Sequence, residues 1–460
     1  HAIPSSRQHF ACRTTMKGYN NAEVKAMQAT YHESAQDLPI SGECDVLVIG
    51  GGPAGFIAAV AAARNGAQVT LIERYGCLGG LATGGLVLYM DSLAKRSGQR
   101  AIGGLPWEAL ERCRALGGLA EEHPLAIHAD SEVLKVVADD MCLQAGVSLR
   151  LHSWAVRAIM ENCAVRGVIT ESKQGREAWY AKVCIDATGD GDLAALAGAA
   201  YELHTQAIGL NLKVGGIDRV TYDRFRREQP EALQELHRQL QEQGGYAFWP
   251  GLTPHSGAGV YWINILGLTQ RHPEEATPAA AREPGNAVEY FRGSLNALDR
   301  EHLTYAEVTL RRQLWDSLEF HKRHIPGFED AMLLQFASQL GVRDSRRIRG
   351  RAQLNKAEMR AGAHPADTIG QAGNSNCPDG VYRVAYGCLV PETTPGLLVA
   401  GRCIWADDYG QQAIRLIPPA MVTGQAAGVA AAMACRAGVL PSDMDIDALR
   451  RQLVADDVML

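Results

Sequence analysis

The sequence predicts an α/β fold in which a mainly parallel sheet flanked by helices is joined to a second, mixed α+β unit. Three stretches support this prediction. Residues 44–73 read as strand, glycine turn, helix and strand, residues 184–192 as a strand ending in a turn of glycines and acids, and residues 396–402 as an apolar strand that leads to an alanine-rich helix. The length of 460 residues exceeds one ordinary core, so two interleaved or consecutive domains are expected.

The first strand, turn and helix have the pattern of a phosphate-binding site. Residues 45–49 are almost wholly apolar, as expected for a strand buried on both faces of a parallel sheet. Gly50, Gly52 and Gly55 follow as GxGxxG: the first allows a tight turn, the second lets the backbone approach a pyrophosphate, and the third lets the helix pack closely on the strand. Pro53 stands in the first turn of the helix, where proline is tolerated.

The helix after this turn carries a stripe of small residues, so it can pack against the sheet and point its amino end at the phosphates. These residues are Ala54, Ala58, Ala59, Ala62 and Ala63. The next strand, residues 69–72, delivers Glu73 about twenty residues after the glycines, where a carboxylate can accept hydrogen bonds from a ribose diol. Because all these elements are in register, a bound dinucleotide is favoured over a glycine turn without a ligand.

A second glycine-rich segment, residues 74–85, follows directly. Five of its twelve residues are glycine, which weakens both helices and strands, so the segment is predicted to be a loop. We interpret it as a second segment that grips the ligand, with a plain flexible linker as the alternative.

Composition narrows the class of protein. The formal net charge of −6 offers no global attraction to nucleic acid or to an anionic membrane, so neither is expected as a partner. The 11 cysteines are scattered without a CxxC pair. This pattern favours reduced thiols in a cytoplasmic protein over disulfides, structural zinc or an iron–sulfur cluster, and no metal site is predicted. No apolar run reaches membrane-spanning length.

The chain is expected to contain a nucleotide-binding domain in two stretches with a second unit between them. The expected divisions are an N-terminal extension (1–40), the first part of the nucleotide-binding domain (41–200), a substrate or cap domain (201–395), the returning strand and helix (396–440) and a C-terminal tail (441–460). Residues 1–15 carry no signal-peptide pattern and are expected to be vector-derived, with the natural start at Met16 or Met27.

Hydrophobic periodicity predicts the remaining elements. Helices are expected within residues 20–40, at 106–116, from Asp130 onward, and at 220–243, 287–300, 304–323, 328–340 and 418–434; strands are expected within 147–185 and at 259–265. Asp130 is a good N-cap for a helix with a buried face of Val133, Val136, Val137 and Met141. For the helix at 304–323, the capping box is Thr304 with Glu307, and the buried stripe is Leu310, Leu314, Trp315 and Leu318.

Together, these segments resemble those of FAD-dependent oxidoreductases with a glutathione-reductase-type FAD-binding fold. The resemblance is carried by the order VIGGGPAG, ERYGCLGGLAT, IDATGDGDLA, GVRDSRRIRG, LLVAGR and RLIPPAMVTGQAAG, over about residues 40–435. Within that family, the sequence is similar to the branch that is distantly related to the fumarate reductase and succinate dehydrogenase flavoproteins. The resemblance implies a Rossmann-like FAD-binding domain, a parallel sheet with a β-meander crossover, and FAD as the cofactor, but it names no substrate.

The resemblance also implies which residues contact the cofactor. The pyrophosphate would be held by Gly50, Gly52, Pro53, Ala54 and Gly55, and the adenosine half by Glu73, the backbone at Val156, Thr188 and Gly189. The cofactor channel would be lined by Arg74, Gly79, Gly80 and Thr83, the ribitol reached by Gly401 and Arg402, and the flavin O2 edge faced by the helix that contains Pro418 and Met421. A helix amino terminus there would stabilise the negative charge of a reduced flavin.

Two segments of this sequence differ from the corresponding segments of the family that it resembles. The fumarate reductase branch attaches its flavin through a histidine near the glycine-rich loop, and residues 74–85 contain none, so non-covalent FAD is predicted. Cys77 is the only nucleophile in that loop, so a flavin bound covalently to its sulfur is the alternative. Otherwise Cys77 is a buried or free thiol. Residues 373–378, GNSNCP, stand where many relatives have an aspartate–histidine pair, so no family role is carried over to that loop.

The predicted function is that of a dehydrogenase, oxidase or reductase, which transfers a hydride between a small organic substrate and flavin N5. An anionic substrate is compatible with this prediction. A second GxGxxG is missing, so an external electron acceptor or reductase is expected rather than a built-in NAD(P)H domain. The alternatives are a flavin monooxygenase or halogenase that uses external NAD(P)H or a reductase, and a non-catalytic or electron-relay flavoprotein subunit. A homo-oligomer is left open.

Candidate substrate-binding and catalytic residues lie in the second unit and in segments expected to pass the flavin. Arg343 and Arg346 belong to the basic run 343–351 and can hold a carboxylate bidentately; a salt-bridged strand is the alternative. His255 is a candidate acid or base in an aromatic cluster that is either core or pocket wall. The cluster also contains Tyr246, Phe248, Trp249, Tyr261 and Trp262. Residues expected to border the isoalloxazine are Asp407, Asp408, Tyr409, Gln411 and Arg415.

Overall fold

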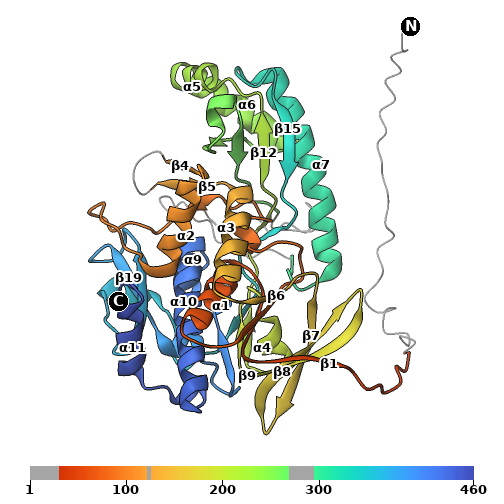
Figure 1. Ribbon diagram of the computed structural model, residues 1–460. Helices are drawn as coiled ribbons and strands as arrows, with labels where there is room; N and C mark the ends of the chain where they lie inside the picture. Colours follow the sequence, from red (N-terminus) through yellow and green to blue (C-terminus); the bar gives the residue numbers. More distant parts are fainter. Residues whose placement is uncertain (1–30, 122–125, 269–294) are drawn as a thin grey trace. The chain divides into compact units, whose positions relative to one another are not determined.

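The computed structural model describes residues 31–121, 126–268 and 295–460, and residues 39–460 form one compact unit (Figure 1). The expected starts at Met16 and Met27 lie outside the described residues, as do residues 20–30 and most of the helix expected at 287–300. Residues 31–39 and 295–299 form neither helix nor strand, so the described ends of those two expected helices are not helical.

A seven-stranded sheet forms the centre of the unit. Its parallel strands, in spatial order, are β6 (Ser148–Arg150), β2 (Val69–Ile72), β1 (Ile40–Ile49), β9 (Gly175–Asp186) and β20 (Leu397–Val399). Strands β7 (Trp154–Glu161) and β8 (Ala164–Ser172) join β9 as an antiparallel meander. This topology confirms the predicted α/β fold with a parallel sheet and a meander crossover.

Strand β9 belongs to both parts of this sheet. One of its edges pairs with β1 up to Asp186, whereas on the other edge residues 175–180 pair with β8 and residues 184–186 pair with β20. Ile49, Asp186 and Val399 therefore stand side by side at the carboxyl ends of three parallel strands. Ligands of open α/β sheets bind outside this edge.

Helices α1 (Pro53–Arg64) and α10 (Ile417–Ala437) pack tightly against each other and run side by side in Figure 1. A Cβ atom at Gly424 would lie 2.1 Å from the carbonyl oxygen of Ala54, and one at Gly428 would lie 2.2 Å from that of Ala58. Only glycine allows this approach, which explains the small residues of both helices. The neighbouring helices are α2 (Gly104–Ala115), α3 (Ser131–Gln144) and α11 (Ile446–Ala455).

Helix α3 starts as predicted but buries a different face. The Asp130 carboxylate accepts hydrogen bonds from the N–H groups of Glu132 (2.8 Å) and Val133 (3.3 Å), so it is the N-cap. The buried residues include Leu134, Val137, Ala138, Met141 and Cys142. Val136 is 51% exposed, so the expected buried face was wrong at this position because the packed stripe is rotated toward Leu134 and Ala138.

A second group of elements encloses its own apolar core, seen in the upper part of Figure 1. Its antiparallel sheet has the order β13 (Pro250–Gly251), β14 (Tyr261–Ile263), β12 (Leu212–Gly215) and β15 (Met332–Phe336). Its helices are α5 (Arg219–Glu228), α6 (Pro230–Glu242) and α7 (Arg300–His324). Leu212, Phe248, Ile263 and Leu310 are among the fully buried residues of this core.

Shorter elements complete the fold. Three strands form one sheet: β3 (Tyr89–Met90), β5 (Ile127–Ala129) and β4 (Leu119–Glu121). Three pairs are β10 (Tyr201–Leu203) with β17 (Arg346–Ile348), β11 (Ile208–Gly209) with β16 (Gly341–Val342), and β18 (Thr368–Gly373) with β19 (Val381–Ala385). The remaining helices are α4 (Asp192–Leu196), α8 (Lys356–Ala361) and α9 (Asp408–Ile414).

Helix boundaries in the second group differ from the sequence-based expectation. The stretch expected as one helix at 220–243 is broken at Pro230, which occupies the first turn of α6. Helix α7 starts before Thr304, because the Asp299 carboxylate caps it by accepting the N–H of Glu301 (2.8 Å). The Thr304 hydroxyl instead donates to the Arg300 carbonyl inside the helix (2.8 Å), so the predicted capping box was wrong.

Two further expectations fail in this group. Residues 328–340 are not a helix, because the segment from Met332 to Phe336 pairs with β12 as strand β15. Trp315 is 46% exposed, although Leu310, Leu314 and Leu318 of the same predicted stripe are buried.

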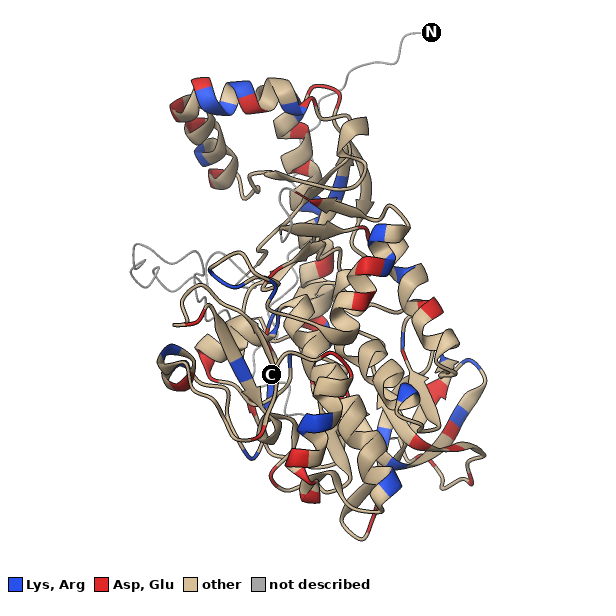
Figure 2. Cartoon of the chain, turned by 60° about the vertical axis from the view of Figure 1, so that its left-hand side comes forward, with Lys and Arg blue, Asp and Glu red and all other residues tan. Residues whose placement is uncertain are grey.

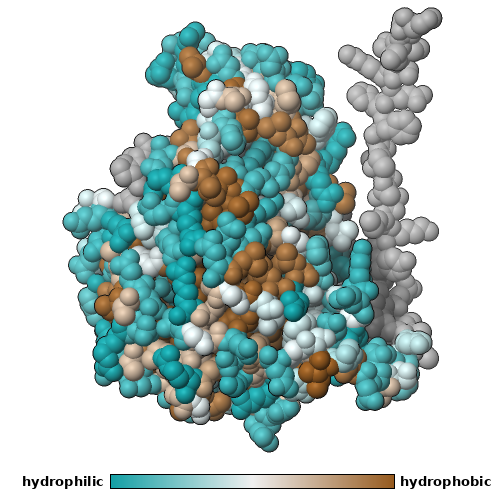
Figure 3. Space-filling view, in the orientation of Figure 1, coloured by the Kyte–Doolittle hydropathy of each residue, from teal (hydrophilic) through white to brown (hydrophobic). Residues whose placement is uncertain are grey.

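The surface is mixed in character. Charged residues of both signs alternate on the uppermost helices of Figure 2, which correspond to α5 and α6, whereas the helices packed at the centre are mostly uncharged. Figure 3 shows separate apolar patches among hydrophilic side chains on the face that it presents. In the described part of the chain, no single helix is long and apolar enough to cross a membrane; the bent pair α9 and α10 passes that test together by length and composition only.

Candidate functional site

The glycine turn after β1 shows which of its glycines serve the protein and which serve a ligand. Gly50 has a φ of +96°, and a Cβ atom there would lie 2.5 Å from the carbonyl oxygen of Ala187. At Gly55 a Cβ atom would lie 1.7 Å from the carbonyl oxygen of Gly50. At Gly52 a Cβ atom would meet nothing within 4 Å. Gly50 and Gly55 are therefore required by the turn itself, whereas Gly52 keeps open a space outside the protein backbone.

Glu73 is held rigidly beside this turn. Its side chain is buried, and its carboxylate accepts hydrogen bonds from the backbone N–H groups of Gly51 (2.6 Å) and Tyr75 (2.8 Å). Burial raises the pKa of the carboxyl, and the two backbone donors oppose that shift. Each carboxylate oxygen has a lone pair left to accept a hydroxyl proton. Gly52 and Glu73 thus fit a pyrophosphate and a ribose of a dinucleotide such as FAD.

A cavity of about 790 Å³ starts at this turn and extends to the second core. Eleven of the residues predicted to contact the cofactor line it: Gly50, Gly52, Pro53, Ala54, Glu73, Arg74, Gly80, Thr188, Gly189, Gly401 and Arg402. Residues of the second core on its wall include Asn211, Trp262, Asn264 and Ile265. The volume lies within the range of small-molecule and cofactor sites.

The second glycine-rich segment lies against the nucleotide turn. The Gly79 N–H donates to the Gly51 carbonyl (2.8 Å), and a Cβ atom at Gly80 would lie 2.8 Å from the Cα of Gly52. The Thr83 hydroxyl donates to the Leu78 carbonyl (2.6 Å) and is buried, so it braces the segment and does not line the cavity. Cys77 is half-buried, and burial raises the pKa of its thiol.

The Asp186 carboxylate fixes the turn that follows β9. Asp186 is fully buried and accepts hydrogen bonds from the Thr188 N–H (3.0 Å), the Thr188 hydroxyl (2.7 Å) and the Ala194 N–H (2.8 Å). Burial raises the pKa of this carboxyl to about 6. These bonds set the backbone at Thr188 and Gly189, which lines the cavity.

The same turn carries a largely buried ion pair. Asp190 Oδ1 accepts hydrogen bonds from Arg402 Nη2 (2.8 Å) and from the Ser345 hydroxyl (2.7 Å). Burial opposes the charges of both Asp190 and Arg402, but their mutual attraction outweighs it, so the pKa of Asp190 is lowered and that of Arg402 is raised. Since Asp190 and Arg402 both line the cavity, this pair presents a balanced charge to a ligand.

Most arginines of the basic run 343–351 have structural partners. Arg346 bonds Asp192 (2.8 Å) and Arg349 bonds Glu202 (2.9 Å). Arg347 is buried and pairs with Asp344 and with Asp408 (2.9 Å). Arg343 differs from these residues: its guanidinium donates to the backbone carbonyls of Ala207 (3.0 Å), Leu266 (2.7 Å) and Ile265 (3.2 Å).

Three of the five candidate catalytic residues reach the cavity: Arg343, Arg346 and Arg415. His255 does not, because its ring is 65% exposed and its Nε2 lies 4.0 Å from Asp130 Oδ2. Tyr409 also lies off the cavity, with its ring facing Lys356 and Arg360 at 5.8 and 5.3 Å.

The other residues expected near the isoalloxazine have structural roles. Asp407 caps α9 by accepting the N–H of Gly410 (2.7 Å), and the buried Gln411 side chain donates to the Arg402 carbonyl (3.0 Å). Six residues predicted to contact the cofactor do not line the cavity: Gly55, Gly79, Thr83, Val156, Pro418 and Met421. Trp154, on the same strand as Val156, lines it instead, as do Leu416, Ile417 and Ala420 at the amino end of α10.

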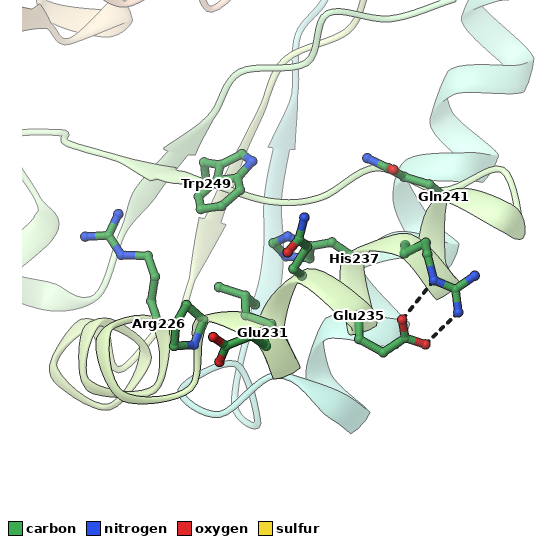
Figure 4. Close-up of a pocket in the computed structure, with 10 residues that line it drawn as sticks. Arg226, Glu231, Glu235, His237, Gln241 and Trp249 are labelled. Atoms are coloured by element: carbon green, nitrogen blue, oxygen red, sulfur yellow. Dashed lines mark hydrogen bonds and ion pairs between the residues drawn. The ribbon is translucent and has the colours of Figure 1, made fainter.

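The aromatic cluster predicted around His255 is divided by the fold. Phe248 is fully buried and stacks on His321, with ring centroids 4.5 Å apart, whereas Trp262 lines the large cavity. Trp249 is 52% exposed and borders a second, open cavity of about 630 Å³ over α6 (Figure 4). Its ring packs edge to face against that of His237, with ring centroids 5.1 Å apart, and none of the candidate catalytic or cofactor-contacting residues lines this second cavity.

Sequence reasoning missed the part of the cavity wall that comes from α7. Arg300, Leu303, Thr304 and Glu307 all face the cavity from the first turns of this helix. Thr304 and Glu307 had been assigned to a capping box at the helix start, so they were not expected on the cavity wall. No local pattern pointed to Tyr89 or Gln339, which reach the cavity from unrelated segments.

Comparison with known proteins agrees with this site. A family model described as FAD dependent oxidoreductase matches residues 45–453. The chain is 37% identical to thiamine thiazole synthase of Desulfosudis oleivorans over 75 residues, which are 16% of this chain and 29% of that protein. It is 55% identical to mitochondrial dihydrolipoyl dehydrogenase of Pisum sativum over 65 residues, which are 14% of this chain and 13% of that protein. The chain thus spans less than a third of the length of these curated relatives.

Solved structures align over much more of the chain, and one of them is a geranylgeranyl bacteriochlorophyll reductase-like protein of Thermoplasma acidophilum. The alignment covers 91% of this chain and 84% of that protein, with 15% sequence identity and a TM-score of 0.44. The family assignment rests on the model match, which includes the glycine turn, Glu73 and strand β20, and the geometry at Gly52 and Glu73 fits the same cofactor, FAD. The chain therefore belongs to the family of FAD-dependent oxidoreductases.

Proposed function

We propose that the protein transfers a hydride between a small organic substrate and FAD. The observation that supports this function most directly is a continuous cavity that reaches from the nucleotide turn to the second core, because a substrate held by the second core would meet a cofactor bound at the turn. Bound FAD supplies the redox chemistry itself, with N5 as the atom that exchanges the hydride. The residues of the chain bind and orient both molecules.

Each end of the cofactor would meet a different part of the sheet edge. The amino end of α1 with Gly52 and Pro53 would bind the pyrophosphate, and Glu73 would accept hydrogen bonds from the ribose. The amino end of α10 lines the cavity through Leu416 and Ile417 and would stabilise negative charge on a reduced flavin.

The cofactor is proposed to be non-covalent. Burial raises the pKa of the Cys77 thiol, which lowers the fraction of the thiolate that would attack the ring. The partners proposed are a small-molecule substrate and an external electron acceptor or reductase.

The test uses the purified protein under anaerobic conditions. Its visible flavin absorption should pass into the supernatant after acid precipitation, and the bound flavin should bleach when a donor substrate is added. Colour retained in the pellet would contradict non-covalent binding and would direct the next experiment to Cys77→Ser. A folded protein that binds FAD but is not reduced by any organic donor, and whose reduced flavin is not reoxidised by any organic acceptor, would contradict the proposed reaction.

A further inference from the structure

Gln339 reaches the cavity from the loop between β15 and β16, in a segment whose neighbours Ala337 and Leu340 are buried in the second core. We propose that its side-chain amide binds the flavin ring of FAD by two hydrogen bonds, donating to the C4 carbonyl and accepting the N3–H. Gly52 and Glu73 belong to the first part of the fold, so Gln339 would add a cofactor contact from the second core.

The backbone at Gln339 is fixed against the glycine-rich segment. The N–H groups of Ser338 (2.8 Å) and Gln339 (3.1 Å) both donate to the Gly84 carbonyl. A Cβ atom at Gly84 would lie 2.5 Å from Gln339 Nε2 and 2.8 Å from its Cδ, so the amide lies directly over this glycine. Since the φ of Gly84 is not left-handed, the space taken by the amide is what explains a glycine here.

Two buried amides in this part of the cavity wall differ in their hydrogen bonds. Asn211 is 5% exposed, and its Oδ1 accepts the Ile265 N–H (3.0 Å). Its Nδ2 donates to the carbonyls of Gly85 (3.2 Å) and Leu86 (3.0 Å). Gln339 is 9% exposed, but among the residues that the structure describes its amide has no hydrogen-bond partner. Because a buried amide is unfavourable without partners, we expect a ligand to supply them.

The place of Gln339 along the cavity favours the flavin half of the cofactor. With the pyrophosphate at Gly52 and a ribose at Glu73, the rest of FAD must extend toward the other end of the cavity. Residues 339–343 line the wall there. Burial lowers the pKa of Arg343 to about 10, and the charge of Arg415 contributes, so these two side chains lie near each other. Residues 339–343 therefore approach the loop that leads into α10, whose amino end also lines the cavity.

The flavin ring offers the partners that a glutamine amide needs. Its pyrimidine ring carries one N–H donor, N3, between two carbonyl acceptors at C2 and C4. An amide can donate to one of these carbonyls and accept the N3–H at the same time. A carboxylate could not donate, and an ammonium or guanidinium group could not accept. Since the amino end of α10 is suited to the C2 carbonyl, the C4 carbonyl is the one left for Gln339.

A hydrogen bond at the C4 carbonyl has a consequence that can be measured without a substrate. It draws electron density from the ring and stabilises the reduced flavin, which raises the midpoint potential. It also changes the electronic environment of the ring and therefore its absorption bands.

The experiment compares the FAD-loaded wild type with Gln339→Met and Gln339→Glu in the absence of any substrate. Met keeps the length of the side chain but removes the donor and the acceptor, and Glu places a negative charge at the carbonyl. The affinity for FAD, the flavin absorption spectrum and the midpoint potential against a reference dye are recorded. The matched control is Gln335→Met, because Gln335 lies on β15 and does not line the cavity.

An independent variant is Gly84→Ala. Its methyl group would displace the Gln339 amide without a strained φ, and Gly84 itself does not line the cavity. If the amide acts on the flavin, Gly84→Ala should reproduce the effects of Gln339→Met, and the double variant should show little further loss.

We expect Gln339→Met to weaken FAD binding at least about tenfold. It should also disfavour the reduced flavin about tenfold, which corresponds to a midpoint potential lower by about 30 mV. Gln339→Glu should lower the potential further, and Gln335→Met should match the wild type. Wild-type affinity, spectrum and potential in Gln339→Met would overturn the proposal, and so would fully additive losses in the double variant.

The result is independent of the proposed hydride transfer. All three measurements concern the bound cofactor alone, so failure of every organic donor and acceptor would contradict the proposed reaction but leave this contact standing. If Gln339→Met changes only the binding of an organic substrate and leaves the flavin unchanged, Gln339 is assigned to the substrate and the proposal is overturned.

Discussion

Lys213 and Asp130 form a buried ion pair between the two apolar cores of the protein. Lys213 Nζ lies 3.3 Å from Asp130 Oδ2 and 3.1 Å from the Ser131 hydroxyl. The two side chains are only 10% and 5% exposed. Lys213 belongs to β12 of the second core, whereas Asp130 caps α3, which packs in the first. The pair therefore couples the wall of the cavity to the nucleotide-binding sheet.

Replacing Lys213 by Met should destabilise the protein strongly, because the Asp130 charge would remain buried without its cation. We expect a loss of about 3 kcal/mol or more in the free energy of unfolding, measured by urea denaturation of the FAD-loaded protein. Asp130→Asn keeps a side-chain oxygen for the helix cap. The double variant should lose less than the sum of the two single losses.

The matched control for this pair is Lys135→Met on the same helix. Lys135 pairs with Glu132 at 2.9 Å, but the Glu132 side chain is 58% exposed, so the loss should stay below about 1 kcal/mol. Equal losses for Lys213→Met and Lys135→Met would contradict a buried, coupled pair.

The glycine turn offers two substitutions with opposite consequences. Gly52→Ala places a methyl group in open space, so the protein should fold with an unchanged thermal midpoint in the absence of FAD, but the methyl group would occupy the place of the pyrophosphate. Gly55→Ala would place its Cβ 1.7 Å from the Gly50 carbonyl oxygen and should prevent normal folding. FAD affinity and far-ultraviolet circular dichroism distinguish the two. Wild-type FAD affinity in Gly52→Ala would place the pyrophosphate elsewhere.

His321 should make the protein sensitive to acid. Its Nε2 accepts the Phe248 N–H (3.0 Å) and its Nδ1 bonds the Ser317 carbonyl (2.7 Å), so the neutral ring satisfies both neighbours. Burial lowers the pKa of His321 to about 3, whereas in the unfolded chain it is about 6.5. Below about pH 6.5 the unfolded state gains a proton that the folded state excludes. The contribution of the neutral His321 ring to the free energy of unfolding is therefore fully present above that pH and is lost as the pH falls below it.

The expected contribution of His321 is about 2.7 kcal/mol of unfolding free energy lost between about pH 6.5 and about pH 4.5. His321→Gln should be less stable at neutral pH but should flatten this part of the pH profile by that amount. His364→Gln is the control, because its imidazole is 64% exposed. A profile for His321→Gln as steep as that of the wild type would contradict this assignment.

The nucleotide end of the site could be predicted from the sequence because its determinants are local. Gly50, Gly52 and Glu73 lie within 24 residues, and each has a backbone or hydrogen-bonding requirement that few other residue types meet. The substrate end depends on segments far apart in the chain. Arg343 and Arg415 meet only through tertiary packing, which no spacing of residues encodes.

The errors in the elements have related causes. The segment that forms β15 has apolar residues compatible with a helix, but pairing with β12 decides its conformation. The start of α7 was misplaced because two residues, Asp299 and Thr304, can each cap a helix, and only the packed structure shows that Asp299 does so. Tertiary contacts also rotated the buried face of α3 away from Val136.

Thiol labelling provides a test of packing that does not depend on a ligand. Cys163 is exposed in the turn between β7 and β8 and should react rapidly with iodoacetamide in the native protein. Cys142 should react slowly, because it is buried with its Sγ 3.9 Å from the Phe56 carbonyl oxygen, and burial raises its pKa to about 12. Peptide mass mapping after a short pulse identifies each site, and Cys163→Ser should remove one fast-reacting thiol without altering the others. Rapid labelling of Cys142 would mean that α3 separates from α1 in solution, which would contradict the close packing of the helices beside the nucleotide turn.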